Sequence, residues 1–73
     1  MHYIYWSDGR DHVEAYETEI EANERVTELN NQVNVLTARI VSRREAGFIL
    51  VPPVNGIYGL ADQREIALDE LSY

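Results

Sequence analysis

The chain has 73 residues, no cysteine and a net charge of −7, from thirteen acidic side chains and six basic ones, all of them Arg. This length predicts one domain over residues 1–73, and the lack of cysteine excludes disulfides, thiol nucleophiles and cysteine-ligated metal sites. The first ten residues do not have the pattern of a secretory signal, and the longest apolar run is too short for a membrane span. We therefore expect a soluble, cytoplasmic protein whose negative charge disfavours direct binding to nucleic acid or to a membrane.

Residues 3–16 have the pattern of a β-hairpin. The run YIYW at 3–6 is rich in strand formers, and HVEAY at 12–16 resumes an alternating pattern. Asp8-Gly9 suits a two-residue turn, because Gly tolerates a positive φ. The resulting register predicts a core-facing set of Ile4, Trp6, Val13 and Ala15. The opposite face would carry Tyr3, Tyr5, His12, Glu14 and Tyr16.

Residues 18–30 predict an acidic amphipathic helix. Thr18 and Glu21 have the spacing of a capping box, and Asn30-Asn31 form a stop signal. At 100° per residue the apolar stripe consists of Ala22, Val26 and Leu29. On roughly the opposite side a row of carboxylates, here called the acidic ridge, consists of Glu17, Glu21, Glu24 and Glu28.

The sequence after this helix favours further strands. Residues 33–42, VNVLTARIVS, alternate as a strand would, with Leu36, Ala38 and Ile40 on the core face. Its other face would carry Val35, Thr37, Arg39 and Val41. RREAG at 43–47 predicts a turn, and FILV at 48–51 predicts a buried strand that ends at Pro52.

The last third of the chain predicts a turn and a short helix. Asn55-Gly56 is a second turn signal, followed by a short strand at 57–60, and residues 62–73 suit a helix whose last two residues fray. The whole pattern predicts an α+β fold. It consists of a small antiparallel sheet (β-β-α-β-β), one amphipathic helix packed on one face, and a short C-terminal helix.

No set of side chains in the sequence marks an enzyme. Neither Ser7 nor Ser42 has a pattern typical of a nucleophile, and the abundant carboxylates lie on an exposed helix with no cleft to shift their pKa values. Asp8, Asp11 and His12 crowd one turn and are close enough to hold a weakly bound divalent ion, but turn acids more often accept backbone N–H groups. We expect a protein that is not an enzyme and has no cofactor and no metal site.

Two functional hypotheses remain. In the first, the chain is a small acidic protein-interaction module, an inhibitor or adaptor that binds a basic, nucleic-acid-handling protein. Its partner-binding residues would be Glu17, Glu21, Glu24, Glu28, Tyr3, Tyr5, His12, Tyr16 and Arg39. In size and charge only, the chain is similar to small acidic inhibitors of phages and mobile elements, anti-CRISPR proteins among them. No residue motif carries that similarity.

In the second hypothesis, the chain is a subunit of a structural homodimer without ligand chemistry. One helix can cover only one face of the sheet, which leaves apolar residues of the later strands to pack between two copies. These residues are Val35, Val41, Ile49 and Val51. The acidic ridge can also be explained as a helix face that is only solvated. Repulsion between its carboxylates costs about 1 kcal/mol at most, which a solvated helix tolerates.

Overall fold

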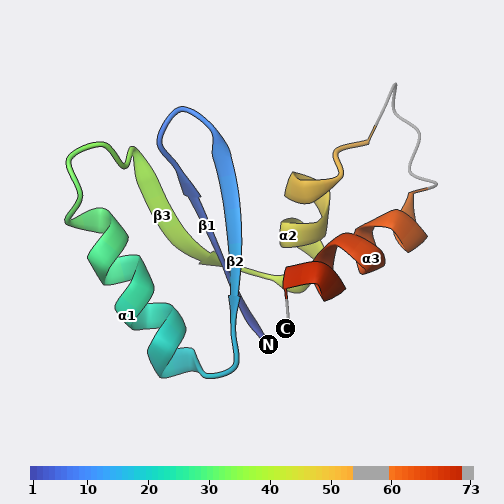
Figure 1. The fold of residues 1–73 in the computed structure, drawn as a ribbon, viewed down its shortest axis with the longest axis horizontal. Coiled ribbons are helices and arrows are strands. Elements are labelled where there is room, and N and C mark those ends of the chain that lie inside the picture. The colour runs from blue at the N-terminus through green and yellow to red at the C-terminus, as the bar shows by residue number, and fades with distance from the viewer. Residues whose placement is uncertain (54–59, 72–73) are drawn as a thin grey trace.

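A computed structural model of the chain describes residues 1–53 and 60–71 and shows an α+β fold. Its elements are β1 (His2–Ser7), β2 (Asp11–Tyr16), α1 (Glu19–Asn30), β3 (Thr37–Val41), α2 (Arg43–Leu50) and α3 (Ala61–Leu71). The strands form an antiparallel sheet in the order β2-β1-β3, with β1 in the centre. Helix α1 lies on one face, and α2 and α3 lie on the other (Figure 1). The predicted fold class, the helix on one face and the C-terminal helix are confirmed.

The hairpin of β1 and β2 has a register one residue away from the predicted one. Trp6 pairs with His12 and Ser7 with Asp11, which leaves a three-residue loop in which Gly9 has a φ of 109°. A slip of one residue turns every side chain of a strand to the other face. Val13 and Ala15 therefore face α2 and α3, whereas His12, Glu14 and Tyr16 lie on the α1 face.

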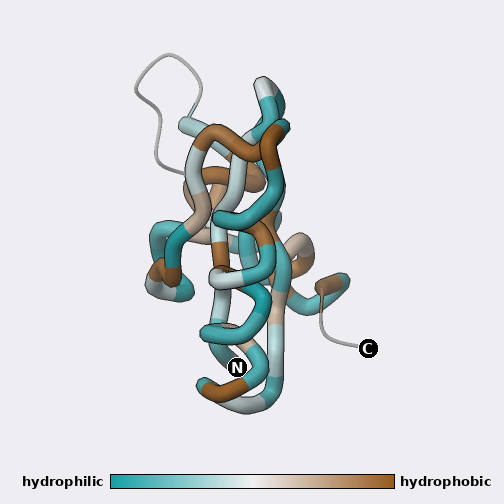
Figure 2. The backbone as a smooth tube through the Cα atoms, turned by 90° about the vertical axis from the view of Figure 1, so that its left-hand side faces the viewer, coloured by the Kyte–Doolittle hydropathy of each residue, from teal (hydrophilic) through white to brown (hydrophobic). Residues whose placement is uncertain are grey.

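Helix α1 begins and ends where the sequence predicts. Thr18 Oγ1 accepts a hydrogen bond from the backbone N–H of Glu21 at 3.2 Å, and Asn31 caps the other end. The buried side chains beneath the helix are Ile4, Ala22, Leu29 and Ala38, and the partly buried ones packed against them are Trp6, Tyr16, Val26 and Val35. Most of α1 is nevertheless hydrophilic, as the view onto the helix in Figure 2 shows.

Two residues predicted for this core lie outside it. The side chain of Leu36 is 75% exposed and that of Ile40 is 43% exposed. Leu36 and Val35 both precede β3, and it is Val35, predicted for the opposite face, that packs on the α1 side, so the predicted alternation is wrong there. Ile40 lies on an edge strand, where only β1 flanks it within the sheet.

The predicted turn at 43–47 and strand at 48–51 are wrong, because residues 43–50 form α2. Ser42 Oγ accepts a hydrogen bond from the backbone N–H of Glu45 at 3.1 Å, which caps the first turn of the helix. The helix ends at Leu50, as expected when a proline follows so closely, because the residue before a proline avoids helical dihedrals.

Helices α2 and α3 cover the second face of the sheet. The buried cluster there consists of Tyr3, Val41, Ala46 and Leu68. Gly47 of α2 packs against α3, where a Cβ on it would lie 3.4 Å from Cβ of Arg64 and from Cδ1 of Leu68, which is about van der Waals contact. The expectation that this face lacks a cover within the chain is therefore wrong. Dimerisation stays a prediction, but an uncovered sheet face no longer supports it.

Part of the predicted pattern lies outside the described residues: the Asn55-Gly56 turn, most of the strand at 57–60, and residues 72–73 of the C-terminal helix. Among the described helices, none combines the length and the apolar composition needed to cross a membrane.

Candidate functional site

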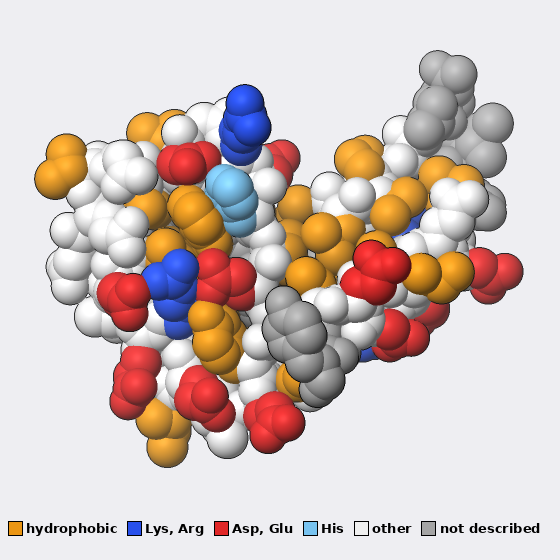
Figure 3. Space-filling model, in the orientation of Figure 1, with side chains coloured by type: hydrophobic (Ala, Val, Ile, Leu, Met, Phe, Trp, Pro, Cys, Tyr) orange, Lys and Arg blue, Asp and Glu red, His pale blue; other side chains and the backbone are white. Residues whose placement is uncertain are grey.

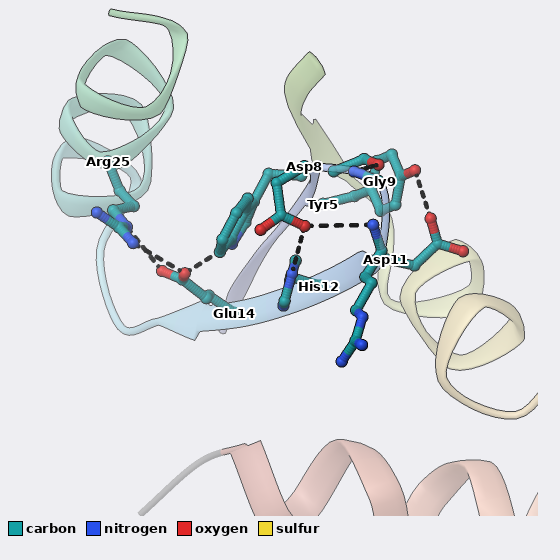
Figure 4. A network of polar contacts seen from close by, with 10 residues as sticks. Tyr5, Asp8, Gly9, Asp11, His12, Glu14 and Arg25 are labelled. Atoms are coloured by element: carbon teal, nitrogen blue, oxygen red, sulfur yellow. Dashed lines mark hydrogen bonds and ion pairs between the residues drawn. The ribbon is translucent and has the colours of Figure 1, made fainter. Parts of the chain in front are cut away.

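A single carboxylate, that of Glu14, ties α1 to the sheet (Figure 4). Its Oε1 accepts hydrogen bonds from Arg25 Nε at 2.9 Å and from the Tyr16 hydroxyl at 2.5 Å. Its Oε2 accepts from Trp6 Nε1 at 2.8 Å and from Arg25 Nη2 at 3.2 Å. The predicted position of Glu14, on the face opposite the core, implied a free carboxylate. In the structure this carboxylate is fully engaged by hydrogen bonds.

The electrostatics of this network keep Glu14 ionised. Burial raises the pKa of Glu14, but hydrogen bonds from Arg25, Tyr16 and Trp6 outweigh burial and hold it below the ordinary value. Burial, together with the bond to Glu14, raises the pKa of Tyr16 to about 12. A carboxylate that already accepts four hydrogen bonds has no lone pair left for a substrate proton. We therefore interpret this network as structural.

The acids at the hairpin loop do not converge on one site. Asp8 Oδ1 lies 3.0 Å from Nε2 of His12, whose ring stacks on Trp6 with 3.9 Å between centroids (Figure 4). The hydrogen bond with His12 lowers the pKa of Asp8. Asp11 belongs to the other face of the sheet, where it accepts a hydrogen bond from the Tyr5 hydroxyl at 2.8 Å. Within residues 1–53 and 60–71, no group of three or more His, Asp or Glu side chains is placed to hold a metal ion.

The predicted sheet-face part of the partner site is not one surface. Tyr3 is only 2% exposed, because α2 packs over it. Tyr5 and Arg39 pair across the sheet on this same face, and Arg39 is bonded to Glu45 of α2 at 2.7 Å. His12 and Tyr16 lie on the α1 face. A one-residue error in register accounts for this separation of residues that were expected together.

The acidic ridge is exposed along its whole length. Glu28 accepts a hydrogen bond from Arg25 Nη1 at 2.6 Å, and the Glu21 carboxylate accepts one from the Thr18 hydroxyl at 2.9 Å. Within the described part of the chain, Glu17, Glu21 and Glu24 form no ion pair. Figure 3 shows acidic side chains gathered along this side of the molecule. Three of the four predicted ridge residues therefore keep an uncompensated charge.

Sequence reasoning missed a cleft of about 560 Å³ between α2 and α3. Its lining consists of Arg43, Arg44, Gly47, Phe48, Ala61, Arg64, Glu65 and Leu68. Three of these are arginines, in a chain with only six. The cleft was missed because residues 48–51 were interpreted as a strand. The spacing of Ser42 and Glu45, the same capping signal that identifies α1, would have indicated the helix.

No protein-family model, no curated protein and no solved structure matches this chain. Its function therefore has to be inferred from the chemistry of its own surfaces.

Proposed function

We propose that this chain is a small acidic protein-interaction module, which binds a protein with a basic surface through the exposed side of α1. The observation that carries this proposal is the unpaired state of Glu17, Glu21 and Glu24 within the described part of the chain. Like charges three or four residues apart repel one another on a helix. A cationic partner would remove that repulsion and gain attraction to each carboxylate.

The attachment of α1 supports this role. The hydrogen bonds between Arg25 and Glu14 fix the helix to the sheet, and the Thr18 cap fixes its first turn. A ridge held in place before binding loses less conformational freedom when a partner arrives, so more of the electrostatic attraction appears as affinity. Arg25 points toward Glu14 of the sheet (Figure 4) and reaches only Glu28 at one end of the ridge, so Glu21 and Glu24 have no cation paired with them among the described residues.

Proteins that handle nucleic acids are the partner class that fits best. Their binding surfaces gather Arg and Lys to contact phosphates, and a row of carboxylates competes for the same side chains. Such a module acts as an inhibitor or adaptor and not as an enzyme. Because cysteine is absent, the protein suits a reducing compartment, and we propose the cytoplasm as its location.

The test compares two variants that remove the same amount of charge from different helices. In the first, Glu21 and Glu24 become Gln; Glu28 is kept because it bonds to Arg25. In the control, Asp62→Asn and Glu70→Gln remove two exposed charges of α3 that form no ion pair with described residues. A partner is first captured from the host with the unchanged protein and purified, and its affinity for all three proteins is then measured at low and high salt.

We expect the α1 variant to bind about fivefold more weakly at low salt, with a flatter salt dependence, while the α3 control keeps its affinity. Equal affinity and equal salt dependence for the two variants would show that the acidic ridge is a solvated surface only.

A further inference from the structure

The cleft between α2 and α3 contains a buried cation that no carboxylate of residues 1–53 and 60–71 neutralises. Arg64 is only 8% exposed, and no carboxylate of the described residues forms an ion pair with it. Its Nε donates to the backbone carbonyl of Val51 at 2.9 Å, and its guanidinium lies 4.2 Å from the centroid of the Phe48 ring. Its Nη2 has no hydrogen-bond partner among the described residues.

This state of Arg64 is energetically unusual. Almost all buried polar atoms in folded proteins have a hydrogen-bond partner, and a buried charge needs one more than a neutral group does. The stacking on Phe48 and the bond to Val51 compensate part of the cost, but they leave Nη2 without an acceptor. Nη2 is itself buried, so an anion seated in the cleft would compensate the charge of the guanidinium from beside it, and would accept from Nη2 once the side chain turned toward it.

A second guanidinium stands on the same aromatic ring. Arg44 lies 5.7 Å from the centroid of Phe48 and is exposed, with no ion pair to a described residue. Arg43, by contrast, is already engaged, since it donates hydrogen bonds to the Tyr3 hydroxyl and to Glu65. The cleft therefore offers the charges of Arg44 and Arg64 to a ligand, and Glu65 and Arg43 neutralise each other at its side.

The lining decides what kind of anion fits. Phe48, Ala61 and Leu68 present apolar surface beside the two guanidinium groups. Ligand pockets of this size are mostly apolar, with a few polar groups that fix the ligand's orientation. A small inorganic ion would leave the apolar part of the cleft in contact with water. A multiply charged phosphate would also be repelled by Glu65 and by the net charge of −7.

We infer that the α2–α3 cleft binds an organic monocarboxylate with an apolar body. The carboxylate accepts hydrogen bonds from the exposed Arg44, whose planar guanidinium has the matching donor geometry, and it compensates the buried charge of Arg64 beside the same aromatic ring. The hydrocarbon or aromatic body lies against Phe48 and Leu68. This site is on the opposite side of the sheet from the acidic ridge, so the two proposals stand or fall separately.

The experiment titrates the full chain with 3-phenylpropionate and follows the NMR signals of the Arg64 Nε–H and the Phe48 ring. Two control ligands are 3-phenylpropionamide, which keeps the body and lacks the charge, and inorganic phosphate, which keeps charge and lacks the body. We expect saturable shifts with the carboxylate and at least about tenfold weaker binding of either control, as expected when a charged hydrogen bond or the apolar contact is lost.

Two arginine variants locate the site. Arg44→Gln removes the exposed guanidinium at the cleft and should weaken binding of 3-phenylpropionate about tenfold. Arg10→Gln makes the same charge change in the hairpin loop and should leave binding unchanged. Neither side chain is buried, so both variants should fold. No saturable binding, equal binding of the amide, tighter binding of phosphate, or equal effects of the two variants would each overturn the proposal.

Discussion

The two faces of the sheet each hold an arginine beneath or beside a helix, and they treat it differently. On the α1 face, Arg25 gives three hydrogen bonds to Glu14 and Glu28. On the other face, the described residues give Arg64 one carbonyl and one aromatic ring, and they give its Nη2 no acceptor. The difference separates two roles of charge: a cation whose donors are bonded to carboxylates holds elements together, whereas a buried cation without a described counter-ion favours an anionic ligand beside it.

The largest expected effect tests whether the α1 side carries more of the stability. Leu29 of α1 is fully buried, and Leu29→Ala should lower the free energy of unfolding by about 3–5 kcal/mol. Leu68→Ala should cost less, about 2 kcal/mol, because Leu68 also lines a cleft into which its neighbours can relax. Urea denaturation of both variants measures this difference. Leu36→Ala is the control, with a change within about 0.5 kcal/mol, because Leu36 is mostly exposed. A larger loss for Leu68→Ala than for Leu29→Ala would reverse the comparison.

The second prediction, with an effect of intermediate size, tests the hydrogen-bond network of Glu14 on the α1 face. Glu14→Gln removes the charge that Arg25 binds, and it should cost about 1–2 kcal/mol at pH 7, between the values for exposed and buried pairs. Because the folded chain holds the pKa of Glu14 below its ordinary value of 4.5, the wild-type advantage is complete above that value. It is lost as the pH falls through the folded pKa.

Urea denaturation of wild type and Glu14→Gln at neutral and at acidic pH gives this difference directly. Glu24→Gln, which removes an exposed carboxylate that forms no ion pair with a described residue, is the matched control and should show no comparable loss. A penalty for Glu14→Gln that persists undiminished in acid would mean that shape and not charge makes Glu14 important.

The prediction with the smallest effect tests whether residues 43–50, on the other face of the sheet, form a capped helix. Ser42→Ala removes the cap of α2 and should cost about 1 kcal/mol, whereas Ser42→Asp keeps an acceptor at the same place and should cost little. Thermal unfolding followed by circular dichroism measures both. If residues 43–50 formed a turn and a strand, as their sequence pattern first indicated, the two variants would behave alike.

The sequence predicts α1 well because its start, its end and its apolar stripe all agree. It predicts β1 equally well, since Ile4 and Trp6 do lie on the α1 face. It predicts β2 poorly because the pattern was interpreted for a sheet with one covered face. Both faces are covered, so Val13 and Ala15 can turn to α2 and α3 while Glu14 turns inward to a partner that only the folded chain supplies.

The candidate sites differ in the same way. The acidic ridge depends only on the spacing of residues along one helix, so its exposure could be predicted without any tertiary information. The α2–α3 cleft depends on where α3 crosses α2, and a hydropathy pattern carries no signal for the packing of Gly47 against Arg64 and Leu68 at that crossing. That Arg64 is buried without a carboxylate partner among the described residues can be recognised only when its neighbours in the fold are known.

The central place of β1 in the sheet has a consequence for how the chain folds. Its pairing with β2 needs only the short loop at Gly9, whereas its pairing with β3 brings Tyr3 beside Val41, across the whole of β2 and α1. Closing the longer loop costs more entropy, and contacts between distant residues slow the search for the native state. We therefore expect the hairpin of β1 and β2 to form first. One edge of β1 then has no strand paired with it until β3 docks. On a ribosome, that edge would stay open to other strands until residues 37–41 had emerged.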